Sequence, residues 1–195
     1  MLNQFFSINL ILRLLVGTVF LFSGLIKLTD PIGFSLTIQA YFQGFAIDFS
    51  SLFLELIPYS LWIAISVCVV EVILGMALLL KFKLELAIRA LLLLTGFFTL
   101  LTLYTLWFGR INSCGCLSNA IPLTPRQSFI KNIFLLLALH LLNKHSNPTA
   151  GSHHRKSTFI YLIFMGMLSI GIGWYTASRL PIIDFSPYQI CNYLH

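Results

Sequence analysis

Five long apolar runs constrain this chain more than any other feature of its sequence. The hydrocarbon core of a bilayer is about 30 Å thick, and a helix needs roughly 20 apolar residues to cross it. Such stretches run from Ile8 to Leu28, Tyr59 to Leu80, Leu86 to Phe108, Ser128 to Leu142 and Thr158 to Ser178. The fourth is the shortest, and it includes Lys131, whose long side chain can reach toward the membrane surface. The runs predict an all-α polytopic membrane protein, with a four-helix transmembrane bundle plus a fifth transmembrane helix.

The composition supports a membrane protein and excludes the main soluble classes. Of the 195 residues, 58% are apolar and only 9% are charged, whereas an ordinary soluble domain has about 25% charged residues. So few polar side chains cannot cover a soluble enzyme or a nucleic-acid-binding domain, and they do not suit a disordered chain. The net charge of +6 is spread between the apolar runs. We therefore expect the lipid bilayer as the surroundings and no nucleic-acid partner.

The basic residues between the runs predict an orientation. Lys81 and Lys83 separate the second run from the third, and Lys144, Arg155 and Lys156 follow the fourth. If every run crosses the membrane, both segments lie on one side, and the positive-inside rule makes that side cytoplasmic. We expect a bacterial inner-membrane protein with its N-terminus in the cytoplasm and its C-terminus outside. The first run lacks the flanking features of a signal peptide, so an uncleaved helix is expected.

These boundaries divide the chain into four parts. Residues 1–143 form the four-helix unit, 144–157 a cytoplasmic loop, 158–178 the fifth transmembrane helix and 179–195 an extracytoplasmic tail. Within the first unit, the segment from Asp30 to Pro58 is too long for a turn. Its spaced aromatic and aliphatic residues predict amphipathic pieces that lie at the outer interface.

The most specific chemical motif is a pair of cysteines separated by one glycine, Cys114-Gly115-Cys116, after the third run. Two such cysteines are close enough to form a disulfide, and Gly115 supplies the backbone freedom that so small a ring needs. Closing so short a loop gains little stability, and strained disulfides are easily reduced. The extracytoplasmic side is also where disulfide chemistry usually takes place. The motif favours a redox-active pair, with two unpaired thiols or a Cu(I) site as alternatives.

Two further cysteines are less specific. Cys68 lies in the middle of the second run, where a free cysteine usually acts as a small hydrophobic residue. Cys191 belongs to the predicted outer tail, on the same side as Cys114 and Cys116. It is a candidate resolving thiol or partner-linking thiol, and the sequence does not separate these roles from no role at all.

A carboxylate in the second run is the other candidate for chemistry. Glu71 lies in an apolar helix, where an ionisable residue is a functional hypothesis by default. Cys68, Glu71 and Gly75 share one helix face, and Gly75 lets a neighbouring helix approach closely. By depth, Arg13 in the first run is the expected partner of Glu71, with Arg89 as the alternative. Such a pair either fixes helix packing or handles protons.

Small residues mark the expected contacts between helices. Gly17 and Gly24 lie seven residues apart on one face of the first run, and Ser169 and Gly173 form a similar seam in the fifth. Lys27, near the outer end of the first run, is interpreted as an anchor whose side chain reaches the membrane surface. From there it is near enough to the outer segments to influence a thiolate.

Three of these features together resemble the DoxX/MauE family of membrane proteins. They are the segment Phe22-Ser23-Gly24-Leu25-Ile26-Lys27-Leu28-Thr29-Asp30-Pro31, the acidic residue Glu71 followed by Gly75, and Cys114-Gly115-Cys116. The resemblance covers about residues 8 to 142, and the cysteine segment is typical of the MauE-like branch. The tail segment Leu180-Pro181-Ile182-Ile183-Asp184-Phe185-Ser186-Pro187-Tyr188 is similar to the one that follows an extra helix in a Bacteroidetes-type subgroup.

The resemblance carries implications for fold and activity. It implies a four-helix membrane bundle akin to disulfide-forming quinone reductases of the vitamin K epoxide reductase type. It also implies a role in the maturation of disulfide-rich periplasmic proteins, with which MauE-like members are associated. DoxX relatives include a subunit of thiosulfate:quinone oxidoreductase, so a small sulfur compound is the other implied substrate.

The residues and the resemblance together predict a membrane thiol–disulfide oxidoreductase. Cys114 and Cys116 would exchange electrons between the thiols of an extracytoplasmic partner protein and a membrane quinone, because the sequence contains no nucleotide or haem motif. The supporting candidates are Glu71, Arg13, Lys27, Cys68 and Cys191, and no metal is expected. Two alternatives stay open: a non-catalytic scaffold or maturation factor for an extracytoplasmic partner, and a DoxX-type enzyme that passes electrons from a small sulfur compound to quinone.

Overall fold

The computed structural model describes residues 2–108, 124–145 and 155–178, and within these ranges the chain is helical. In chain order the elements are α1 (Leu2–Thr29), α2 (Pro31–Asp48), the 3₁₀ helix η1 (Ser51–Tyr59), α3 (Ser60–Leu79), α4 (Leu84–Phe108), α5 (Pro125–His145) and α6 (Arg155–Ser178). The five apolar runs lie in α1, α3, α4, α5 and α6, so the all-α prediction is confirmed.

Four segments of the described chain are long and apolar enough to cross a membrane. They are Asn9–Thr29 in α1, Ser51–Leu79 in η1 and α3, Leu84–Phe108 in α4 and Ser157–Ser178 in α6. Helix α5 is not among them. Its 21 residues would extend over about 31 Å, but several basic and polar side chains reduce its hydropathy. The chain is therefore a polytopic membrane protein, and a crossing by α5 stays a prediction.

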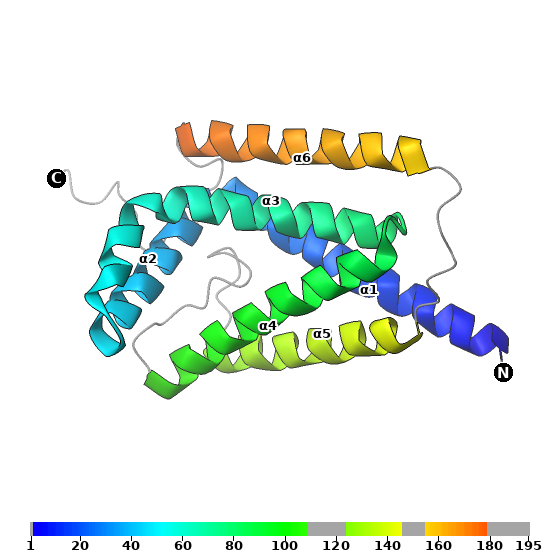
Figure 1. Cartoon of the computed structure of the whole chain (residues 1–195), viewed down its shortest axis with the longest axis horizontal. Coiled ribbons are helices and arrows are strands. Elements are labelled where there is room, and N and C mark those ends of the chain that lie inside the picture. Colours follow the sequence, from blue (N-terminus) through cyan, green and yellow to red (C-terminus); the bar gives the residue numbers. More distant parts are fainter. Residues whose placement is uncertain (1, 109–123, 146–154, 179–195) are drawn as a thin grey trace.

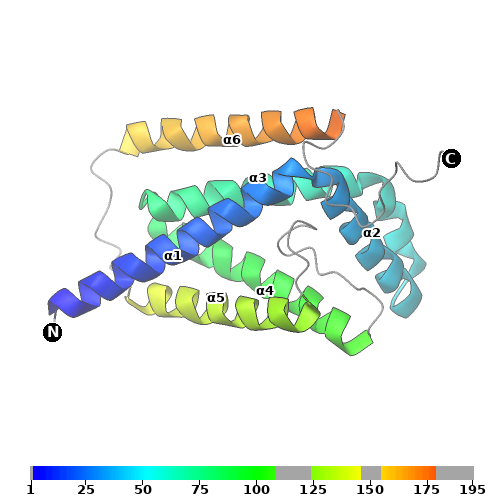
Figure 2. The same ribbon diagram turned by 180° about the vertical axis from the view of Figure 1, so that it is seen from behind.

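The long helices form a bundle, and α2 and η1 lie across one of its ends (Figure 1). Helix α1 packs along α3, and α4 packs along α5. Helix α6 lies against α3 on the side away from α5, and it also contacts α1 and α2 (Figure 2). The Thr176 hydroxyl of α6 donates a hydrogen bond to the carbonyl of Leu28 at 2.9 Å. This bond ties the end of α1 to α6.

Glycines bring α1 and α3 into backbone contact. A Cβ atom on Gly75 would lie 2.9 Å from the backbone nitrogen of Leu21 and 3.0 Å from the carbonyl oxygen of Gly17. A Cβ atom on Gly24 would lie 3.0 Å from the carbonyl oxygen of Cys68. Because real side chains do not fit at these distances, the two helices approach closely only where glycine is present. The predicted helix contacts at Gly17, Gly24 and Gly75 are confirmed, and the structure shows that these glycines bring α1 against α3.

The break between α1 and α2 follows from two adjacent residues. Pro31 occupies the first turn of α2, and the Asp30 carboxylate accepts a hydrogen bond from the backbone N–H of Gly33 at 2.8 Å. Proline cannot continue α1 but suits the first turn of a helix, and aspartate caps it. Phe34 is buried, so α2 begins inside the bundle. The segment between residues 30 and 58 is helical and its first turn packs into the bundle, whereas its position at the outer membrane interface stays a prediction.

Side-chain contacts join the last turns of α4 to α2. The Tyr104 hydroxyl donates a hydrogen bond to the Asp48 carboxylate at 2.5 Å, and the hydroxyls of Tyr41 and Thr105 are 2.9 Å apart. Phe45 packs edge-on against Tyr104, with the ring centres 4.7 Å apart. The end of α4 from which the Cys114-Gly115-Cys116 segment follows is thus held by α2.

Candidate functional site

A buried ion pair joins α1 to α3 in the interior of the bundle. The Lys27 ammonium donates a hydrogen bond to Oε1 of Glu71 at 2.6 Å, and the two side chains are only 1% and 2% exposed. Charges so far from water are stable only when they are paired, because desolvating a single ion costs several kcal/mol, on the order of the protein's whole stability. The stability of the described core therefore depends on both members of the pair being present.

The predicted partner of Glu71 was wrong. Glu71 pairs with Lys27, whereas Arg13 lies 14 residues earlier on α1, about 21 Å along the helix axis. The contacts of Gly24 with Val72 and of Gly17 with Leu79 fix the antiparallel alignment of α1 on α3. That alignment places Glu71 opposite the last turns of α1 and leaves Arg13 beyond the site.

The interpretation of Lys27 as a surface anchor was also wrong. Its side chain is enclosed, and the ammonium lies over the aromatic faces of Phe34 and Phe98, 5.0 and 4.6 Å from the ring centres. A cation is attracted to the negative face of an aromatic ring, and the attraction is stronger without water. The two rings therefore stabilise the ammonium on the sides that Glu71 does not cover.

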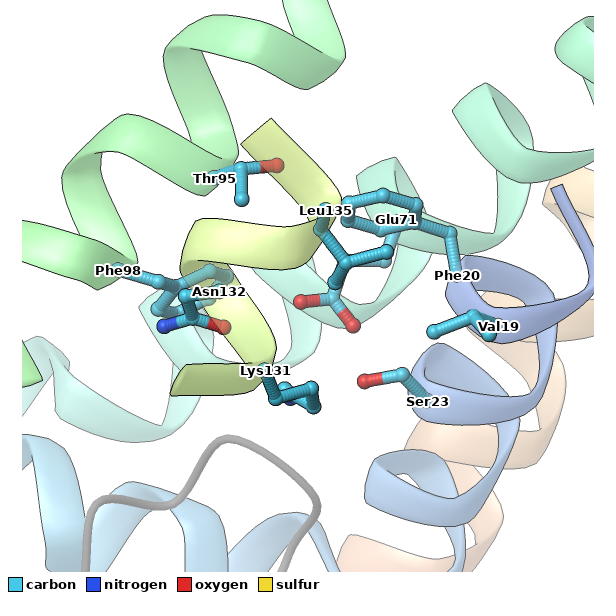
Figure 3. Close-up of a pocket in the computed structure, with 9 residues that line it drawn as sticks. All are labelled: Val19, Phe20, Ser23, Glu71, Thr95, Phe98, Lys131, Asn132 and Leu135. Atoms are coloured by element: carbon cyan, nitrogen blue, oxygen red, sulfur yellow. The ribbon is translucent and has the colours of Figure 1, made fainter. Parts of the chain in front are cut away.

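A small cavity lined by both apolar and polar side chains lies beside the carboxylate. It has a volume of about 20 Å³, and its lining includes Ser23, Thr95, Lys131 and Asn132. Figure 3 shows the Glu71 carboxylate and the Ser23 hydroxyl directed toward each other, with Asn132 close by. Oε2 of Glu71 has no hydrogen-bond partner among the described residues. A cavity of roughly 10–15 Å³ suffices for one water molecule when polar partners surround it.

This arrangement can do two things chemically. The Oε1 side of Glu71 holds α1 against α3 through Lys27, and its Oε2 side borders a space that accepts one water. A carboxylate between an ammonium and a water can take up and return a proton. The ion pair shows that Glu71 takes part in helix packing, and proton handling by Glu71 stays a prediction.

The other predicted site residues fall into two groups. Cys68 is completely buried against apolar side chains that include Leu28, Phe34 and Val72, which agrees with its interpretation as a small hydrophobic residue. Cys114, Cys116 and Cys191 lie outside the described residues. Their roles stay predictions.

Lys27 was a supporting candidate, but its pairing with Glu71 was not predicted from the sequence, and neither were the other residues around the pair. Lys27 follows Gly24 by three residues and so lies on the face of α1 that packs against α3; this spacing was the available signal. Asn132 is a polar residue in the apolar run of α5, and it is 3% exposed. Lys131 was expected to reach the membrane surface, yet its half-buried side chain lines the cavity. For Phe34 and Phe98 the sequence held no signal.

Within residues 2–108, 124–145 and 155–178, no group of three or more His, Cys, Asp or Glu side chains is placed to hold a metal ion. No curated protein and no solved structure gives a significant match to the chain. The family model described as methylamine utilisation protein MauE matches residues 6–143, which is most of the chain. We conclude that the chain belongs to the MauE family of membrane proteins.

Proposed function

We propose that the protein is a membrane thiol–disulfide oxidoreductase in which Cys114 and Cys116 cycle between a dithiol and a disulfide. The observation that carries the proposal is the Cys114-Gly115-Cys116 motif, which follows the end of α4 closely in a member of the MauE family. The end of α4 is held by α2 through Tyr104 and Asp48, so the motif follows a fixed part of the bundle.

The proposed reaction has two balanced steps. A thiolate of an extracytoplasmic partner protein attacks the Cys114–Cys116 disulfide, and its second thiolate resolves the mixed disulfide. The partner becomes oxidised, and Cys114 and Cys116 become thiols. A membrane quinone, as the second substrate, then takes two electrons and two protons from this dithiol and leaves as quinol, which restores the disulfide.

Glu71 supports the proton part of this proposal. One of its oxygens faces a cavity of about 20 Å³, in which Ser23 and Asn132 are further polar partners. That volume accommodates a water but not a quinone ring, so we place no quinone there. We propose that Glu71 accepts and returns one proton through this water during the redox cycle.

The orientation of the chain belongs to the same proposal. Lys81 and Lys83 lie between α3 and α4, at the end of the bundle opposite α2. The positive-inside rule places this end in the cytoplasm of a bacterial cell. The N-terminus is then cytoplasmic, and Cys114, Cys116 and the C-terminus face the extracytoplasmic partner.

The redox state of the cysteine pair in intact cells tests the proposal. Free thiols are trapped with a mass-shifting maleimide before and after quinone depletion, and Cys114 and Cys116 are then assigned by mass spectrometry. We expect the pair to become reduced when quinone is withdrawn, because the second step stops. A pair that stays in one state under both conditions contradicts the enzyme and favours the scaffold alternative.

Purified protein in nanodiscs separates the substrates. Quinone reduction is measured with a reduced dithiol protein and, separately, with thiosulfate as electron donor. The Cys114→Ser/Cys116→Ser variant should lose activity with the dithiol protein, and Cys68→Ala, which removes a buried thiol, should keep it. Activity with thiosulfate alone would instead support the small-sulfur-compound enzyme.

A further inference from the structure

Apolar side chains close the cavity beside Glu71 toward one end of the bundle. Four helices line the cavity, through Ser23 of α1, Glu71 of α3, Thr95 of α4 and Asn132 of α5. On each helix the residue seven positions nearer the turn between α3 and α4 is apolar and completely buried; these residues are Val16, Leu78, Ile88 and Leu139. Seven residues are two helical turns, or about 10 Å. A layer of packed apolar side chains therefore separates Glu71 from that end of the bundle.

Toward the opposite end, α5 presents polar side chains to the interior. Asn132 is 3% exposed, Lys131 is half-buried, and both line the cavity. Figure 3 shows both residues on α5, on one side of the space that the Glu71 carboxylate faces. Because part of Lys131 is exposed, no more than the length of one side chain separates the cavity from the surface of the bundle.

Ser128 lies between this polar face and the exposed start of α5. It precedes Asn132 by four residues, so it lies on the same helix face and about 6 Å nearer the start of α5. Its side chain is 1% exposed, and its Oγ has no hydrogen-bond partner among the described residues. A buried hydroxyl without a partner is unfavourable unless water reaches it. Gln127, the preceding residue, is exposed, so water has only the first turn of α5 to pass.

We propose that protons reach Glu71 from the extracytoplasmic side along this face of α5, through waters that Ser128 and Asn132 hold in position. The inference rests on the proposed function and adds two positioning residues to it. A proton passes from a water at the Ser128 hydroxyl to the water in the cavity and then to Oε2 of Glu71, and it returns by the same route. The route consumes no protons, because the two that leave with the quinol equal the two that the dithiol of the partner protein supplies.

Silver ions test the route without any redox reaction. The full-length protein with its four native cysteines replaced receives either Ser128→Cys or Leu139→Cys, which lies in the apolar layer. Ag⁺ is added outside right-side-out membrane vesicles, and thiols that have not bound it are labelled with maleimide after denaturation. We expect Ag⁺ to abolish the labelling of Ser128→Cys and to leave that of Leu139→Cys unchanged. Equal labelling of the two variants, or protection of Ser128→Cys only when Ag⁺ enters from the cytoplasmic side, would overturn the proposal.

Single turnovers of the quinone step test the positioning role. Protein reduced at Cys114 and Cys116 is mixed with a quinone in nanodiscs, and quinol formation is followed. Asn132→Ala should slow this step roughly tenfold, the cost of one hydrogen bond lost to the relay water. Formate, a small weak acid that can carry a proton into the space left by the asparagine, should restore part of the rate. Ser169→Ala, which removes a buried hydroxyl from α6, should have no effect.

The outcomes separate this inference from the proposed function. An unchanged rate in Asn132→Ala, or a loss that formate does not restore, would overturn the route while the oxidoreductase stands. If the unmodified protein forms no quinol, the oxidoreductase fails, and the Ag⁺ pattern at Ser128→Cys and Leu139→Cys decides whether water reaches the cavity from the extracytoplasmic side.

Discussion

At the scale of single residues, the main electrostatic contact in the described core is the buried Lys27–Glu71 ion pair. The two side chains come from different helices and are each almost completely enclosed. The attraction between them offsets the loss of hydration only while both are present. Phe34 and Phe98 add aromatic faces to the ammonium, and the cavity admits one water to Glu71.

Substitutions of the pair should be strongly non-additive. Lys27→Met or Glu71→Met alone leaves a buried charge without its partner, and each should destabilise the protein by about 3–5 kcal/mol. The Lys27→Met/Glu71→Met variant removes both charges and should lie much closer to the parent. Unfolding in mixed micelles measures the three free energies, and additive effects would show that the two residues do not stabilise one another.

At the scale of elements, the contact between α1 and α3 sets the geometry of the site. Close approach at Gly17, Gly24 and Gly75 aligns the two helices, and this alignment brings Lys27 opposite Glu71. Helix α2 then covers the pair from its first turn, where Phe34 lies over the ammonium. A change in the spacing of α1 and α3 should therefore disturb the ion pair even when both charged residues are intact.

Glycine substitutions test this dependence. Gly75→Ala places a Cβ against backbone atoms of Leu21 and Gly17, which cannot move separately from α1, so we expect a loss of about 1–3 kcal/mol of stability. Gly96→Ala and Gly171→Ala are matched controls, because nothing lies within 4 Å of their new Cβ atoms. The controls should be neutral or stabilising by up to about 1 kcal/mol. Similar losses at all three positions would exclude close packing as the cause.

At the scale of the whole molecule, the apolar surface is what a bilayer requires. Large apolar side chains are exposed along every transmembrane candidate, among them Ile11, Trp62, Leu93 and Phe164. In water such a surface would drive aggregation, whereas lipid accommodates it. Glu55 in η1 and Lys144 in α5 are charged residues exposed at opposite ends of the bundle. Labelling at these two positions can therefore identify which end faces which compartment.

The proposed orientation predicts a labelling pattern. In a variant with the four native cysteines replaced, Glu55→Cys should react with a membrane-impermeant maleimide in intact cells. Lys144→Cys should react only after the membranes are opened, because the positive-inside rule places that end of α5 in the cytoplasm. The reverse pattern would place Cys114 and Cys116 in the cytoplasm and remove the basis for extracytoplasmic disulfide exchange.

The sequence by itself determined the class of the protein and most of its helices. Apolar runs of about 20 residues have one stable arrangement in a bilayer, because every backbone polar group must be satisfied within the segment. The close contact at Gly17, Gly24 and Gly75 was also predictable, since small residues on one face indicate where helices meet. The cysteine motif was recognisable from its spacing alone, although Cys114 and Cys116 lie outside the described residues.

Only the tertiary structure decided which charges meet. The expected depth of each residue in the membrane favoured Arg13 as the partner of Glu71, because each apolar run was assumed to begin and end at a membrane surface. In the folded protein the end of α1 at Leu28 lies near Ile65, in the first half of α3, and α2 begins inside the bundle. Lys27 therefore reaches Glu71. The partner of a buried charge depends on the relative alignment of two helices that are distant in sequence, and that alignment is set by close packing of their backbones.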